Sequence, residues 1–116
     1  MKILYRSGKS DKQHFTLEIK VADTFWLRLK GLLATRQLPM AQGLLLKQCN
    51  SIHMFGMLYP LDIVYLDKQG FILKLVENLK PFQISCCWKA QDTLEVKSGM
   101  IKQAGWKIGE QLKWQK

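Results

Sequence analysis

Residues 61–76 read LDIVYLDKQGFILKLV, and this stretch decides the fold. Two apolar runs flank Lys68-Gln69-Gly70, where glycine supplies the positive φ that a tight turn needs. The pattern predicts a hairpin made of strands at residues 61–67 and 71–76. The second run is almost continuously apolar, which predicts a strand that is covered on both faces.

Further strands are predicted on either side of this hairpin. Residues 15–21 alternate between apolar and polar side chains, which is typical of a strand with one buried face. Residues 3–5 form a short apolar run, and the polar residues 7–13 between the two predict an opening hairpin. Leu94 and Val96 are expected to point inward from a later strand. The remaining predicted strands are residues 43–47, 49–55, 83–88, 93–97 and 111–114.

Two helical segments are also predicted. Asp23 or Thr24 can cap a helix, and apolar side chains then recur at helical spacing, which predicts one amphipathic helix near residues 24–34. Ser98 is expected to cap a short helical turn near residues 99–104, which Gly105 ends. The predicted fold class is α+β, with mostly antiparallel strands in a compact barrel-like or two-layer sheet and a single domain over residues 1–116.

Composition limits the class of protein. The formal net charge is +9 and is spread along the chain, so we expect only non-specific attraction to nucleic acid. The apolar run at residues 43–46 is far shorter than the ~20 residues of a membrane span. The first residues do not resemble a secretory signal, so a soluble, cytoplasmic protein is expected. Three cysteines, Cys49, Cys86 and Cys87, predict free thiols because an odd number makes a poor disulfide framework.

Several spaced motifs resemble one known family. They are A-x-T-x-x-x-R-x-x-G-L at residues 22–32, GLLL at 43–46, PLDI-x-YLD-x-x-G at 60–70, LEV-x-x-G at 94–99 and GE-x-L at 109–112. Together they resemble the domain of unknown function 192 family, which implies a compact, mostly β fold and implies no activity. Many members carry Trp-Met-Lys-Asn-Thr before the Pro-Leu-Asp segment, whereas residues 53–57 here read HMFGM. Members often carry an export signal, whereas none is expected from the first residues of this sequence.

The best candidate for chemistry is Cys49-x-Ser51-x-His53. If this stretch is extended, the three side chains share one face. Cys49 and His53 are then ~13 Å apart along a straight strand, whereas a nucleophile and its base need ~3 Å. Asp62 interrupts an apolar neighbourhood and is expected to pair with Arg36 or Arg28 or to accept hydrogen bonds from the backbone after Pro60.

The leading hypothesis is a non-enzymatic accessory module that binds a small molecule or a protein partner. Its expected ligand pocket consists of Arg36, Cys49, Ser51, His53 and Asp62. One alternative is a hydrolase or transferase that uses His53 with Ser51 or Cys49. Another is a weak nucleic-acid binder with aromatic side chains among its lysines, although core packing is the expected use of the aromatics Trp26, Trp88, Trp106 and Trp114. No metal or other cofactor is expected, because the spacing of histidines and cysteines matches no ligand set.

Overall fold

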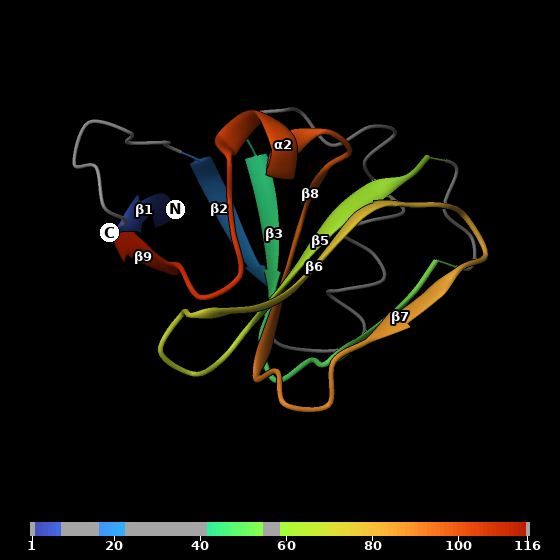
Figure 1. Ribbon diagram of the computed structural model, residues 1–116, viewed down its shortest axis with the longest axis horizontal. Helices are drawn as coiled ribbons and strands as arrows, with labels where there is room; N and C mark the ends of the chain where they lie inside the picture. Colours follow the sequence, from blue (N-terminus) through green and yellow to red (C-terminus); the bar gives the residue numbers. More distant parts are fainter. Residues whose placement is uncertain (1, 8–16, 23–41, 55–58, 116) are drawn as a thin grey trace.

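The computed structural model describes residues 2–7, 17–22, 42–54 and 59–115 (Figure 1). These residues form nine strands and one short helix, and each predicted strand overlaps one of the nine. The strands are β1 (Lys2–Ser7), β2 (Leu17–Ala22), β3 (Gln42–Leu46), β4 (Ser51–His53), β5 (Leu61–Leu66), β6 (Ile72–Leu79), β7 (Ile84–Cys86), β8 (Asp92–Lys97) and β9 (Gln111–Gln115), and the helix is α2 (Met100–Ala104). The helix predicted near residues 24–34 lies outside the described residues.

The strands form one large sheet and one small sheet. The large sheet has seven strands in the order β6-β5-β8-β3-β2-β1-β9, and only the β2–β3 pair is parallel. The small sheet is the antiparallel pair of β4 and β7. β1 and β2 form the predicted opening hairpin, and the two ends of the chain lie side by side because β1 also pairs with β9 (Figure 1). The prediction of a mostly antiparallel β protein is confirmed.

The described part of the large sheet is open, although its two edge strands meet at one end. A single bridge joins Phe71 to Gln111. Beside it the Leu112 N–H donates to the Gly70 carbonyl at 2.9 Å. Gly70 has φ +90°, and a Cβ at this position would lie 2.4 Å from the Leu112 carbonyl oxygen. The predicted turn therefore needs its glycine twice, once for the backbone conformation and once for this contact.

Both faces of the large sheet carry a core. α2 packs on one face, with a cluster that includes Val64, Leu94 and Trp106. The small sheet packs on the other face, where Ile52 joins a cluster built around Ile63. β5 lies between these two layers, and all six of its residues are buried. None of the helices in the described ranges is long and apolar enough to cross a membrane.

Two expectations about strand faces are wrong. β6, the run predicted to be covered on both faces, is an edge strand with several exposed residues, and its partner β5 is the strand that is covered twice. β8 was expected to bury only Leu94 and Val96, but Thr93 and Glu95 are fully buried as well. Glu95 is paired with Ile63 across the strands, so it faces the cluster beneath the small sheet rather than solvent.

α2 forms where the short helical turn was predicted, but its cap differs. The N-cap residue is Gly99, which has φ 98° and no side chain with which to cap the helix. Ser98 does not cap the helix, because its hydroxyl donates to Asn78 Oδ1 at 2.8 Å. At the other end Gly105 is left-handed, and its N–H donates to the Ile101 and Lys102 carbonyls. The predicted end of the helix is therefore correct.

Candidate functional site

Asp62 is fully buried and accepts hydrogen bonds only from backbone groups in the described contacts. Its Oδ1 accepts from the Asn78 N–H at 2.8 Å. Its Oδ2 accepts from the N–H groups of Gly99 and Ile101, both at 3.0 Å. A carboxylate on β5 thus caps α2 from 37 residues away, at the end where free N–H groups favour negative charge. Asp62 thus bonds to the backbone, but its partners lie far along the chain and not in the backbone after Pro60 as expected. Arg28 and Arg36 lie outside the described residues.

Cys49 is buried and fixed at the start of the small sheet. Its thiol donates to the Ser51 carbonyl at 3.1 Å. Its N–H donates to the Gln91 carbonyl at 2.9 Å, and its carbonyl accepts from the Thr93 hydroxyl at 2.6 Å. All three cysteines are free, as predicted. The thiol is therefore bonded to its own segment, and the backbone of Cys49 is bonded to the beginning of β8.

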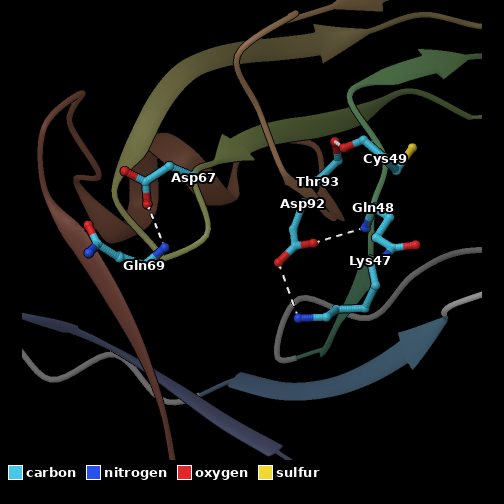
Figure 2. A network of polar contacts seen from close by, with 7 residues as sticks. All are labelled: Lys47, Gln48, Cys49, Asp67, Gln69, Asp92 and Thr93. Carbon is cyan, nitrogen blue, oxygen red and sulfur yellow. Dashed lines mark hydrogen bonds and ion pairs between the residues drawn. The ribbon is translucent and has the colours of Figure 1, made fainter.

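Asp92 supports the turn that leads from β3 into β4. Its Oδ1 accepts from the Gln48 N–H at 3.0 Å and its Oδ2 from Lys47 Nζ at 3.3 Å (Figure 2). Gln48 is left-handed, with φ 52°, a conformation that a side chain adopts only at some cost. The buried carboxylate stabilises this conformation and so sets the direction in which β4 departs. No sequence signal pointed to Asp92, because its two partners come from a distant turn.

The predicted extended conformation is confirmed for Ser51–His53, which is β4. In the register with β7, Ser51 lies opposite Cys86 and His53 lies opposite Ile84. The ladder continues beyond the strands, since the Cys87 N–H donates to the Asn50 carbonyl and the Met54 N–H to the Gln83 carbonyl. Opposed residues of an antiparallel pair share a face, so Ser51 and Cys86 lie on the same side of the small sheet.

The predicted pocket residues do not all belong to one element. Cys49, Ser51 and His53 follow one another along the small sheet, and Cys49 packs in the same cluster as Ile63. Asp62 alternates with Ile63 on β5 and bonds to α2, so its carboxylate lies on the opposite face of the large sheet from Cys49. Arg36 lies outside the described residues.

β7 and the two turns that flank it expose large apolar side chains that sequence reasoning missed. Trp88, Phe82 and Ile84 are 80%, 71% and 57% exposed, although all three are large and apolar. Ile84 lies in β7, and the other two lie in the turns just before and just after it. We call these three residues the β7 surface. Core packing was the expected use of the tryptophans; that is correct for Trp106, which is buried, and wrong for Trp88.

Lysines surround the β7 surface. Lys80 and Lys89 are exposed and adjoin the two turns. Lys74 reaches across from β6, and its Nζ donates to the Cys86 carbonyl at 2.9 Å. Residues 80–91 contain no aspartate or glutamate. The nearest acid that follows, Asp92, is buried and already bonded. A sequence signal did exist, because a large aromatic residue lies within two residues of a lysine on both sides of β7, at Lys80-Pro81-Phe82 and at Trp88-Lys89.

Two tyrosines near the small sheet have altered acidity. Burial raises the pKa of Tyr65 to about 12, an effect that the Ser85 side chain partly offsets and the nearby thiols increase. Burial also raises the pKa of Tyr59, and the negative charge of Glu95 raises it further. Both phenols are therefore neutral at physiological pH and are not activated nucleophiles. Within the described ranges, no group of three or more histidine, cysteine, aspartate or glutamate side chains could hold a metal ion.

In the part of the chain that the structure describes, the fold is mostly antiparallel β, with one short helix and a small second sheet on opposite faces of a seven-stranded sheet. The chain belongs to the DUF192 family, described as an uncharacterized ACR, which matches residues 6–114. The resemblance inferred from the sequence motifs is therefore confirmed.

Individual relatives agree with this placement. The chain is 29% identical to a UPF0127 protein of Thermococcus sibiricus over 113 residues, which cover 93% of this chain and 73% of the relative. It is similar in structure to a candidate transcription regulator from Sinorhizobium meliloti 1021, with a TM-score of 0.84, 23% identity and coverage of 98% and 94% of the two chains. It is also similar in structure to a protein of unknown function from Novosphingobium aromaticivorans DSM 12444. The TM-score is 0.81, the identity is 18%, and the match covers 97% of this chain and 84% of the other. These two structures support the fold alone.

Proposed function

We propose that this chain is a non-enzymatic binding module and that the β7 surface is its contact surface. One observation carries the proposal: three large apolar side chains are exposed together on one short segment. Exposed apolar side chains are common singly, but a group of them marks an interaction site. Aromatic side chains such as Trp88 and Phe82 also contribute most of the binding energy in many interfaces.

The small sheet is well suited to present such a surface. Its inner side is packed, because Ile52 and Met54 are buried in the cluster against β5. Its backbone ladder runs from Asn50 to Met54 and from Phe82 to Cys87. A surface that is already ordered loses little conformational entropy when it binds. The β7 surface therefore favours binding without a change in fold.

The pocket predicted from Arg36, Cys49, Ser51, His53 and Asp62 stays a prediction. Ser51 and His53 belong to β4, directly opposite Cys86 and Ile84 of β7. A ligand held there would lie on the same small sheet as the β7 surface. Cys49 and Asp62 already bond to backbone groups, so their part in binding would be to position β4 and α2.

Site-directed photo-cross-linking in living cells tests the proposal. A benzophenone amino acid replaces Phe82 or Trp88 in one pair of variants. In a control variant it replaces Ile108, which is 66% exposed and lies beside a lysine in another turn. We expect discrete adducts, of protein or of lipid, from positions 82 and 88 only. The proposal is wrong if neither position yields an adduct, or if the Ile108 variant yields the same ones.

A further inference from the structure

We propose that the partner of the β7 surface is an anionic lipid surface, on which the chain rests without crossing it. This inference depends on the proposed function, because it names what the same three side chains contact. Three features of the molecule support this partner: the charge around the surface, the edge of β7 and the kinds of side chain that are exposed.

Charge indicates an anionic partner. Lys80 adjoins the turn of Phe82, and Lys89 directly follows Trp88. Lys74 brings its ammonium group to the Cys86 carbonyl between them. Residues 80–91 include no acid, so no carboxylate of this segment offsets Lys80 and Lys89. The exposed acid that precedes the segment is Glu77 on β6. Lysines near a bilayer are attracted to anionic headgroups, and the net charge of +9 acts in the same direction at longer range.

The edge of β7 argues against an added protein strand. The Cys87 and Met54 N–H groups bond across the β4–β7 pair. Because hydrogen-bonded and non-hydrogen-bonded pairs alternate along an antiparallel ladder, the Cys86 carbonyl points away from β4. That carbonyl is where a further strand would bond, and it already accepts from Lys74 Nζ at 2.9 Å. A lysine at a strand edge is a common way to prevent strand addition. β7 is also only three residues long, which leaves little backbone for a partner strand.

The exposed side chains suit a bilayer interface. Tryptophan is enriched at the level of lipid headgroups, because its ring is largely apolar and its N–H stays hydrated. Phe82 and Ile84 can enter the acyl boundary singly, without a shaped groove to receive them. Lysine side chains can lie along the boundary while their ammonium groups stay in water. The segment thus combines apolar insertion with electrostatic attraction, the two contributions that hold proteins at a membrane surface.

The test is sedimentation of the full chain with vesicles. We expect binding to vesicles of equal parts phosphatidylcholine and phosphatidylserine, and weak or no binding to phosphatidylcholine alone. The Phe82→Ser/Trp88→Ser double variant should bind at least about tenfold more weakly, because two large apolar side chains no longer insert. Ile108→Ser is the control and should bind as the wild type, since the loop between α2 and β9 lies on the far side of the molecule from β7 (Figure 1).

A matched pair of charge variants tests the electrostatic part. One variant changes Lys74, Lys80 and Lys89 to glutamine. The other variant makes the same change at Lys68, Lys102 and Lys107, which are also exposed but do not adjoin β7. Both lose the same net charge, so only a local effect separates them. The first should lose several-fold more affinity for anionic vesicles than the second, and raising the salt to about 1 M should weaken binding of the wild type. Circular dichroism confirms that each variant is folded.

Three outcomes overturn the inference: no binding to anionic vesicles, equal losses in the two charge variants, or an Ile108→Ser loss that matches the double variant. Protein adducts in the cross-linking experiment, together with no vesicle binding, leave the proposed function standing and overturn only the lipid assignment. If positions 82 and 88 yield no adduct of any kind, the proposed function itself fails.

Discussion

Replacing Asp62 should destabilise the protein more than any other single change to a carboxylate in the described residues. The side chain joins β5 to Asn78 and to the first turn of α2 through three backbone N–H groups. Asp62→Ala removes all three acceptors. Asp62→Asn keeps the shape, but its NH₂ group must face a backbone donor on one side or the other.

The expected loss follows from the number of donors that are left without a partner. A hydrogen bond to a charged group contributes about 1.5–3 kcal/mol, and a buried donor without a partner costs about 1–3 kcal/mol. The three bonds share one carboxylate, so their effects do not add fully. We expect Asp62→Ala to lower the free energy of unfolding by about 4 kcal/mol and Asp62→Asn by about 2–3 kcal/mol. Against a typical total of about 5–15 kcal/mol, the first is a large fraction.

Urea unfolding of the wild type and the two variants measures these changes. Asp67→Asn is the matched control. Asp67 Oδ1 also accepts two backbone bonds, one from Gln69 (Figure 2) and one from Phe71. These bonds lie in an exposed turn, where a loss of about 1 kcal/mol is expected. Amide exchange of Ile101 should accelerate in the Asp62 variants and not in the control. A cost below about 1 kcal/mol for Asp62→Asn would refute the argument that the carboxylate holds α2 in place.

Three further predictions concern a turn, a tyrosine and the net charge. Gly70→Ala should lower the free energy of unfolding by about 3 kcal/mol, measured by urea unfolding, because φ is +90° and the added Cβ would meet the Leu112 carbonyl; a change below about 1 kcal/mol would contradict this. Folding raises the pKa of Tyr65 from 10.0 to about 12, so its contribution to stability is complete below pH 10 and is lost as the pH rises through about 12. In Tyr65→Phe, the drop in the free energy of unfolding between about pH 10 and pH 12 should be smaller by about 2 kcal/mol, measured by unfolding curves at each pH. An unchanged pH profile would contradict this role of Tyr65. Binding to single-stranded oligonucleotides should stay in the micromolar or weaker range at physiological salt and should fall with salt like non-specific attraction; tight, salt-resistant binding in a fluorescence titration would favour a nucleic-acid role instead.

The sequence predicts the strands well because their signals are local. The hairpin at residues 61–76 and the alternation at 15–21 depend on side chains within one strand or turn. The position of a strand within a sheet is not a local property. For that reason the apolar run of β6 predicts a strand covered on both faces, whereas β5 is the strand that is covered in this way. Glu95 looked solvent-exposed for the same reason, because the cluster that covers it is built from β4 and β5.

In the candidate site, too, the features that depend on local sequence could be predicted, and the contacts between distant segments could not. The extended form of Ser51–His53 could be predicted, since it needs only the local pattern. The role of Asp62 could not, because its partners at Asn78, Gly99 and Ile101 come together only when β5, β6 and α2 have packed. The exposure of Trp88 could not be predicted either, because an apolar side chain is normally assigned to the core when nothing in the sequence says otherwise.

Contacts within the fold account for the burial of Asp62, Asp92 and Cys49, but they do not account for the exposed apolar side chains of the β7 surface. Asp62 and Asp92 are both satisfied by contacts that hold a helix and a turn in place, and the Cys49 thiol bonds to its own strand. Replacing any of them should therefore change stability first. Phe82, Ile84 and Trp88 contribute little to the core, because most of each side chain lies in solvent. Substituting them with serine should leave stability almost unchanged, so a loss of binding in those variants would be a direct effect on contact with the partner.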